Sequence, residues 1–393
     1  MVQSVENSTI PFETNSDVSD ADDQQIPHSL EGAPFRLIGK LFLRHGLRRK
    51  GQRGLGTWAK LFAMSAVGFP FRLHEQYSLD RRKAMQSLMQ PPLFLIGHWR
   101  SGTTHLHNLM TCDQQFGCLT MKHCITADSF LTIPKWIENW IAAQVPQERP
   151  VDGVKLGWQA PQEEEFALER LSDLSYNHCY LFPDRAQKIF RHSVLLDDEA
   201  TRLRWAEEYH MLLQRLSYDQ AGRKLCLKNP PNTGRLALLN EMYPEAKFVF
   251  IVRHPEHVFR STRKLWNTVT RMLGLTACDE ERLEENFLTF YDLIMKRYLA
   301  DREAIPPDRL VEIKYEDLDR DPLMTIANVY DQLGLYGFQR VLPRLEQYLG
   351  TLSSYTKNSH SLNERDRRTV QERWGFAYDE WNYQERVLQE RAA

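Results

Sequence analysis

The chain has 393 residues, of which 42% are hydrophobic and 26% charged. This ordinary globular composition excludes collagen, coiled coil and global disorder, and a core of this size needs no metal or disulfide staples. Lys and Arg number 50 against 52 for Asp and Glu, a net charge of -2, so no bulk basic field indicates a nucleic-acid partner. The 6 cysteines contain no C-x-x-C spacing, which indicates reduced structural thiols and no metal site.

The first 90 residues form two segments of opposite charge. Residues 1–33 hold seven acidic residues and no Lys or Arg, so we expect a disordered acidic tail. The segment 34–90 opens with a basic stretch, 36–53, that carries seven Lys or Arg and no acid among apolar residues. This pattern predicts an amphipathic helix that packs on the domain with its charges in solvent. Peripheral contact with an anionic membrane or a partner is the alternative.

No targeting or membrane-spanning segment is expected. The N-terminus lacks the basic start and apolar run of a signal peptide. The best uncharged apolar run, 61–71, is too short to span a bilayer. We therefore expect a cytoplasmic protein, soluble or peripheral to a membrane.

From residue 91, short apolar runs alternate with helix-length segments, which is typical of a parallel sheet with helical crossovers. The expected strands are 93–96, 225–227, 248–252 and 310–313, and the expected helices are 200–217, 232–243, 281–300 and 322–333. About 125 residues separate the first two strands, too many for one crossover. The domain 91–393 is thus predicted to be α/β, with a central parallel sheet flanked by helices and a helical insertion, 112–221, that covers the substrate.

A glycine-bearing loop follows the first expected strand. Gly97 and Gly102 stand five apart and Thr104 follows, so the frame matches G-x-x-x-x-G-K-[ST] with Thr103 at the lysine position. Backbone N–H groups at a helix N-terminus bind a phosphate whatever its parent molecule. The missing lysine would serve the terminal phosphates of a nucleoside triphosphate, so its absence argues against ATP or GTP hydrolysis. Arg100 can instead offer a planar fork to an oxyanion.

A second candidate anion site follows the third expected strand. This strand ends in Arg253, and Ser261 follows eight residues later. A strand-end arginine and a helix hydroxyl can grip one phosphate together, the arginine through charge-assisted bidentate bonds. Pairing of Arg253 with a neighbouring carboxylate is the alternative that these residues leave open.

Together these segments resemble the sulfotransferase family, in particular its bacterial branch. The similarity rests on four motifs: G-H-W-R-S-G-T-T at 97–104, P-Q-E-E-E-F at 161–166, Arg253 with Ser261, and Y-E-D-L at 315–318. The resemblance implies a P-loop-like α/β sandwich. It also implies transfer of a sulfuryl group from 3′-phosphoadenylyl sulfate (PAPS), without metal, to a hydroxyl or amine of a small molecule, glycan or lipid.

The resemblance also assigns cofactor contacts. The residues implied at the 5′-phosphosulfate are Arg100, Ser101, Gly102, Thr103 and Thr104, and those at the 3′-phosphate are Arg253 and Ser261, with Tyr315 near the nucleotide. Two stretches depart from the family pattern. The K-T-H strand end is here Lys228-Asn229-Pro230, which loses the histidine base. No R-K-G-x-x-G stretch is evident, and Lys357 with Asn358 is the substitute assigned to the 3′-phosphate or adenine.

Sulfuryl transfer moves a charged group in line between two oxygens, so catalysis needs positioning, electrostatic stabilisation and one base. We expect Arg100 to hold the sulfuryl oxygens and Lys228 to neutralise charge on the bridging oxygen. The preferred base is Glu163, a carboxylate near a lysine. Its rivals are Glu164, Glu165, His98, His123 and His254. Acidic residues that complement a helix dipole are the alternative explanation for the glutamates.

Two other functions remain open from the residues alone. One is a P-loop-type nucleotide kinase, although no strand-end Asp for magnesium is evident near 228 or 253. The other is a non-catalytic nucleotide-binding scaffold. The acceptor cannot be read from the sequence, since Trp136, Trp140 and Trp158 of the insertion can stack on a sugar or a lipid-like ring, or equally form a helical core.

Overall fold

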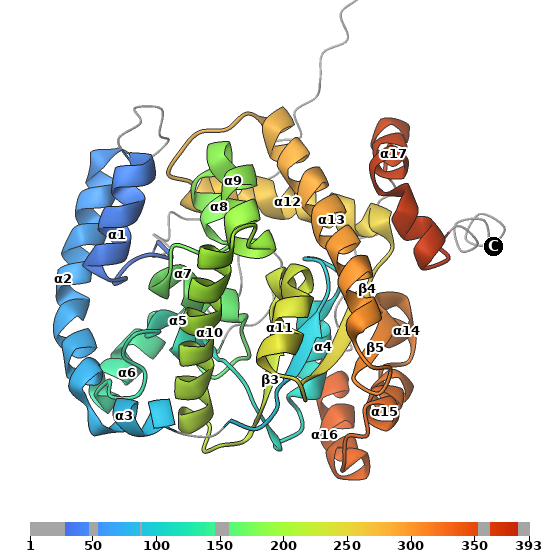
Figure 1. Cartoon of the computed structure of the whole chain (residues 1–393), viewed down its shortest axis with the longest axis horizontal. Helices are drawn as coiled ribbons and strands as arrows, with labels where there is room; N and C mark the ends of the chain where they lie inside the picture. The colour runs from blue at the N-terminus through green and yellow to red at the C-terminus, as the bar shows by residue number, and fades with distance from the viewer. Residues whose placement is uncertain (1–27, 47–53, 87–88, 146–156, 353–361, 384–393) are drawn as a thin grey trace, which may run out of the picture.

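A computed structural model of the chain describes residues 28–46, 54–86, 89–145, 157–352 and 362–383 (Figure 1). Its centre is a five-stranded sheet of order β2-β3-β1-β4-β5, and every strand pair in it is parallel. The strands are β1 (Leu93–Ile96), β2 (Phe116–Gly117), β3 (Lys224–Lys228), β4 (Lys247–Val252) and β5 (Leu310–Lys314). The predicted α/β class and central parallel sheet are confirmed. The four expected strands are present, and β2, a two-residue edge strand, was not expected.

Helices flank the sheet (Figure 1). They are α1 (Phe35–Leu41), α2 (Leu55–Tyr77), α3 (Leu79–Gln86), α4 (Thr103–Met110), α5 (Met121–Ile125), α6 (Lys135–Ala142), α7 (Glu164–Leu171), α8 (His178–Leu181), α9 (Ala186–Phe190), α10 (Glu199–Asp219), α11 (Leu236–Met242), α12 (Pro255–Leu273), α13 (Glu280–Asp301), α14 (Tyr315–Arg320), α15 (Pro322–Gln332), α16 (Phe338–Gly350) and α17 (Glu364–Glu380). The segment 112–221 therefore holds α5 to α10 together with β2. None of the described helices is long and apolar enough to cross a membrane.

The helix expected over 232–243 begins differently. A 3-10 turn, Pro230–Arg235, precedes α11. Pro230 and Pro231 have no N–H to donate, so they fit the first turn of such an element and cannot continue a ladder. This turn fixes the path of the chain directly after β3.

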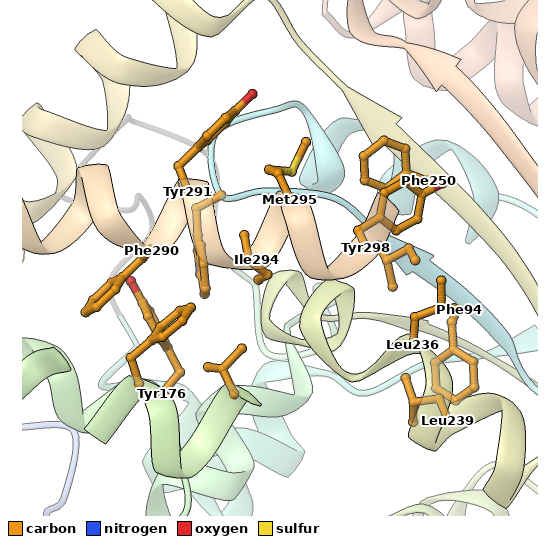
Figure 2. Close-up of a cluster of buried hydrophobic side chains, with 14 of the residues drawn as sticks. Phe94, Tyr176, Leu236, Leu239, Phe250, Phe290, Tyr291, Ile294, Met295 and Tyr298 are labelled. Carbon is orange, nitrogen blue, oxygen red and sulfur yellow. The ribbon is translucent and has the colours of Figure 1, made fainter. Parts of the chain in front are cut away.

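The sheet is buried on both faces, which is why its strands read as continuous apolar runs. On one face Phe250 stacks on Tyr298 of α13 with ring centroids 3.7 Å apart, and Phe94 lies beside Leu236 of α11 (Figure 2). On the other face the alternate residues, such as Leu95, pack with residues of α4, α15 and α16. Because side chains alternate across a strand, both faces of the sheet are packed against helices. The carboxyl ends of the strands lie together at one edge of the sheet.

The N-terminal segment packs on the domain. The predicted disordered tail extends to residue 33, but residues 28–33 form turns in which Leu30 and Ala33 are buried; residues 1–27 lie outside the described residues. Helix α1 buries Leu37, Ile38 and Leu41, and Lys40 and Arg44 pair with Asp173. The helix continues as a π turn, Phe42–Gly46, and 47–53 lie outside the described residues.

Candidate functional site

The site lies at the carboxyl edge of the sheet. The loop 97–102 follows β1, Lys228 ends β3, Arg253 follows β4 and Tyr315 follows β5. In parallel α/β sheets this edge is where ligands bind, because strand ends and helix N-termini meet there. Of the predicted site residues, Lys357 and Asn358 lie outside the described residues.

The loop after β1 is held tightly against its neighbours. Gly97 N donates to Thr233 Oγ1 at 2.8 Å, and Ser101 Oγ donates to the His98 carbonyl at 2.6 Å. Gly97 has φ 149°, and a Cβ there would lie 2.3 Å from the Ile251 carbonyl oxygen of β4. The loop therefore has one available path, which presents the N-terminus of α4 at the sheet edge. Thr233, which no motif assigned, helps to set that path.

Tyr315 closes the other side of the loop. Gly102 has φ 96°, and a Cβ on it would lie 2.2 Å from Tyr315 Cδ2. The Arg253 guanidinium lies over the Tyr315 ring, 4.1 Å from its centroid. Because Tyr315 touches both the loop and Arg253, it links the two predicted anion sites through an aromatic ring.

The two anion sites are in direct contact. Arg100 Nε donates to Ser261 Oγ at 2.7 Å, and Arg253 Nη1 donates to the Arg100 carbonyl at 3.3 Å. In the described part of the chain, Arg253 contacts this carbonyl and the Tyr315 ring rather than a carboxylate, and its buried Nε has no hydrogen-bond partner there. A buried cationic donor without a partner fits an anionic ligand.

The side chain of Arg100 lies in the second anion site. Sequence reasoning placed its guanidinium on the transferred group at the first site, whereas the structure places its Nε on Ser261. Arg100 has φ 69°, one of the few left-handed non-glycine residues described. Such a conformation costs an arginine roughly 1–3 kcal/mol and persists where the surroundings require it.

A lysine from β3 reaches the helix that follows the loop. Lys228 Nζ donates to Glu163 Oε1 at 2.5 Å and to Thr104 Oγ1 at 3.4 Å. The register of β1 against β3 places Leu95 opposite Lys228, so the ammonium arrives beside the start of α4. The neighbouring strand thus brings an ammonium group to the start of α4.

The three successive glutamates of P-Q-E-E-E-F have different surroundings. Only Glu163 among them contacts the Lys228 ammonium, and its side chain is 15% exposed. Glu164 is buried and accepts hydrogen bonds from Lys228 N at 3.0 Å and Tyr209 Oη at 3.2 Å. Burial raises the pKa of Glu164 from 4.5 to about 8, against the opposing effect of the Lys228 ammonium.

Glu165 is held in a separate polar network. Its carboxylate accepts from Tyr176 N at 2.5 Å, from Asn229 Nδ2 at 2.9 Å and from Arg235 Nη1 at 3.1 Å. Both members of the Glu165–Arg235 ion pair are fully buried. Glu164 and Glu165 therefore organise the end of β3, and the geometry leaves Glu163 facing the site.

The candidate histidines are engaged elsewhere. His98 Nδ1 donates to the Trp99 carbonyl at 2.8 Å, and burial lowers the pKa of His98 to about 3. His123 accepts from Thr120 N and bonds Asp219 Oδ2 at 3.0 Å. His254 accepts from Glu256 N as the N-cap of α12, and burial lowers its pKa to about 4. At neutral pH these pKa values keep His98 and His254 uncharged.

Aromatic side chains of the insertion stand beside the site. Tyr176 stacks on Trp99 of the loop with ring centroids 4.0 Å apart, and Tyr180 lies against Trp266 at 4.9 Å. Burial raises the pKa of the Tyr180 hydroxyl. No sequence motif indicated these tyrosines.

The tryptophans singled out in the insertion lie apart from this wall. Trp136 and Trp140 are exposed on α6, and Trp158 Nε1 donates to Glu138. Among the described residues, no group of three or more His, Cys, Asp or Glu side chains could hold a metal ion.

The chain is similar in sequence to known sulfotransferases. A model of the sulfotransferase family matches residues 91–339. The chain is 32% identical over 324 residues to omega-hydroxy-beta-dihydromenaquinone-9 sulfotransferase Stf3 of Mycobacterium bovis (strain ATCC BAA-935 / AF2122/97), which covers 81% of this chain and 82% of the relative. The same protein of Mycobacterium tuberculosis (strain CDC 1551 / Oshkosh) matches to the same extent.

Solved structures share the fold. Sulfotransferase STF9 from Mycobacterium avium superimposes with a TM-score of 0.66 at 18% identity, over 91% of this chain and 98% of that one. Sulfotransferase STF1 from Mycobacterium tuberculosis H37Rv gives a TM-score of 0.62 at 20% identity, over 88% and 99%. At these identities the likeness concerns the fold of the chain.

Proposed function

Because the chain belongs to the sulfotransferase family, we propose that it transfers a sulfuryl group from PAPS to the hydroxyl of a lipid-like acceptor. The observation that carries the donor assignment is the contact between the two anion sites. Arg253 Nη1 donates to the Arg100 carbonyl of the loop, and the Tyr315 ring packs on both Gly102 and the Arg253 guanidinium, so a single small ligand can reach both sites. A nucleotide with phosphates at its two ends has the charges that this pair of sites can accept.

The 5′-phosphosulfate is assigned to the start of α4. The backbone N–H groups of 102–104 open this helix, and its dipole favours an anion there. The side chains of Ser101, Thr103 and Thr104 belong to the same turn.

The 3′-phosphate is assigned to Arg253, Ser261 and the Arg100 guanidinium, because these groups converge after β4. Tyr315 holds the Arg253 guanidinium in place through its ring. Lys357 and Asn358, outside the described residues, remain proposed contacts of the 3′-phosphate or adenine.

Glu163 is assigned as the base. In the proposed reaction its carboxylate takes the acceptor hydroxyl proton while the acceptor oxygen forms a bond to sulfur. The bond from sulfur to the bridging oxygen breaks, and adenosine 3′,5′-bisphosphate leaves with that electron pair. Lys228, 2.5 Å from Glu163 and 3.4 Å from Thr104, is placed to neutralise charge on the bridging oxygen.

A lipid-like acceptor is supported by the relative Stf3, whose name gives a hydroxylated menaquinone as its acceptor, at 32% identity. Trp99 of the loop packs with Tyr176, and Tyr176 with Tyr180, in a buried aromatic cluster next to the proposed donor site. A kinase is disfavoured, since Thr103 stands where a nucleoside-triphosphate loop needs lysine. A scaffold without turnover remains the competing function that experiment separates.

Two measurements test this function. Calorimetry should show that adenosine 3′,5′-bisphosphate binds without metal and more tightly than ATP with Mg²⁺. Mass spectrometry of lipid extracts incubated with the protein and isotopically labelled PAPS should show an acceptor that gains one labelled sulfuryl group. Tighter binding of Mg²⁺–ATP would favour a kinase, and binding of the bisphosphate without any sulfated product across a broad panel of lipid, glycan and phenolic acceptors would favour a scaffold.

A further inference from the structure

Helix α2 forms one outer edge of the molecule (Figure 1). The exposed side of this helix is apolar. Its inner side buries Trp58, Leu61 and Ser65. Its exposed positions from 55 to 73 are Leu55, Gly56, Ala59, Lys60, Ala63, Ala66, Val67, Phe69, Pro70 and Leu73. Lys60 is the one charged residue among these exposed positions, and it pairs with Glu31 at 2.7 Å. A surface helix normally carries charged residues on its outer side, so this face is unusual for contact with water.

Elements next to α2 also expose large apolar side chains. Leu79, which opens α3, is 61% exposed, and Leu43, which follows α1, is 70% exposed. Helix α6 begins four residues after Leu131, whose N–H donates to Glu75 of α2 at 2.9 Å. Trp136 and Trp140, one helical turn apart on α6, are 73% and 65% exposed. Tryptophan with an exposed ring is the residue most enriched where apolar and aqueous phases meet.

Exposed cations lie on the helices next to this face. Residues 34–90 contain twelve Lys or Arg and two acidic residues. Of the twelve, four lie in 47–53, outside the described residues, and Lys40, Arg44, Lys60 and Arg72 pair with Asp173, Glu31 or Asp128. The two acids are also engaged: Glu75 is buried and paired with Arg215, and Asp80 accepts from the Tyr218 hydroxyl. Arg36 on α1, next to the Phe35 ring that stacks on Phe62 of α2, and Arg82 and Lys83 on α3, which follows α2, are exposed. An apolar helix face with basic flanks is complementary to an anionic lipid surface.

We propose that the outer face of α2, with Trp136 and Trp140 of α6, docks the protein on an anionic membrane surface. The helix lies flat at the interface and does not span the bilayer, because its inner side packs on the domain through Trp58, Leu61 and the buried Glu75. Apolar side chains enter the boundary between headgroups and acyl chains, and the flanking cations face anionic headgroups. This docking does not depend on the donor or on the reaction proposed above.

Vesicle flotation tests the proposal with the full chain. The probe is vesicles of phosphatidylcholine alone or with an equimolar share of phosphatidylglycerol. The wild type should float with the anionic vesicles, less with neutral ones, and less at high salt. Val67→Asp and Leu55→Asp, at positions 62% and 75% exposed, should each lower the bound fraction by about tenfold, since a charge would enter the apolar boundary.

Met324→Asp is the matched control. Met324 is 58% exposed on α15, away from α2, so this variant should float like the wild type (Figure 1). Thermal melting of each variant verifies that it is folded. Equal flotation of the wild type, Val67→Asp and Leu55→Asp would overturn the proposal. So would failure of the folded wild type to float with either vesicle, or a soluble dimer that Val67→Asp dissociates, which would assign this face to a second copy of the chain.

Discussion

At the scale of single residues, adjacent positions in one motif carry unrelated tasks. Consecutive residues at a helix start point about 100° apart, so their side chains meet different neighbours. Glu163 reaches the Lys228 ammonium, Glu164 lies beneath the backbone of Lys228, and Glu165 pairs with Arg235. The charge at the site therefore depends on which partner each carboxylate contacts. The number of acidic residues in the motif does not determine it.

Replacement of the proposed base tests the assignment directly. Glu163→Gln should lower turnover by about 10²–10⁴ while adenosine 3′,5′-bisphosphate still binds, since general-base catalysis is worth that much. Steady-state rates and calorimetry measure the two effects. Glu346→Gln, at an exposed position on α16, is the control and should keep the wild-type rate. Near-full turnover of Glu163→Gln would remove Glu163 from this role.

Glu164 should make stability dependent on pH. Its pKa is about 8 in the folded state against 4.5 ordinarily, so between these values the folded chain holds a proton that the unfolded chain has released. The Glu164 contribution is therefore present at low pH and is lost as the pH rises towards 8, by up to about 1.4 kcal/mol per pH unit.

The comparison with Glu164→Gln isolates this effect. Denaturant unfolding from pH 5 to 8 should show a steeper fall in the free energy of unfolding for the wild type than for the variant. Glu169→Gln is a useful parallel, because burial also raises the pKa of Glu169, to about 7. Identical pH profiles for the wild type and Glu164→Gln would contradict the raised pKa.

At the scale of elements, the site is a junction of strand ends. β1, β3, β4 and β5 each deliver one component, and the order β3-β1-β4-β5 makes these components neighbours. The loop is confined between β4 and Tyr315, where Gly97 and Gly102 leave no room for a Cβ. Because each component belongs to a rigid element, the two anion sites keep their separation.

Removal of the strand-end cation should weaken donor binding. Arg253→Ala should cost at least about 2 kcal/mol of bisphosphate affinity, the scale of a lost charge-assisted hydrogen bond, which is about thirtyfold in Kd. Arg271→Ala, an exposed arginine on α12, the helix that follows Arg253, is the matched control and should bind like the wild type. Calorimetry measures the Kd of the bisphosphate for each variant. An unchanged Kd for Arg253→Ala would count against the assignment of the 3′-phosphate to this residue.

At the scale of the whole molecule, a buried ion pair ties the outer helix to the domain. Arg215 of α10 pairs with Glu75 of α2, and its guanidinium lies over the Phe130 ring, 4.4 Å from the centroid. Glu75 also accepts from Leu131 N. One cluster therefore joins α2, α10 and the segment that precedes α6.

Breaking this pair should loosen α2. Arg215→Met leaves Glu75 buried without its cation, which costs about 3–5 kcal/mol of stability. Denaturant unfolding measures the loss, and hydrogen exchange should locate faster exchange in α2. Arg297→Met is the control: Arg297 is 46% exposed in an i,i+4 pair with Asp301, so less than about 1 kcal/mol should be lost. If both variants lost the same free energy of unfolding, the buried pair would stabilise the fold no more than the exposed pair does.

The sequence by itself determined four of the five strands of the sheet and the two motifs that we propose bind anions. Buried strands need apolar runs and a phosphate loop needs small residues at set spacing, and both are properties of neighbouring residues. The four expected strands and the Gly97–Thr104 frame were therefore readable, while β2, two residues long, had no such pattern. The composition of the N-terminus predicted a disordered tail that included residues 28–33. It missed the burial of Leu30 because that burial depends on contacts with residues outside the segment.

Only the tertiary structure decided which of these residues act together. Lys228 of β3 reaches Thr104 at the start of α4, and its partner Glu163 is 65 positions away in the sequence. The Arg100 side chain joins Ser261, 161 positions away. Such contacts depend on strand order and register, which local pattern does not encode, because packing of distant segments sets where a side chain ends.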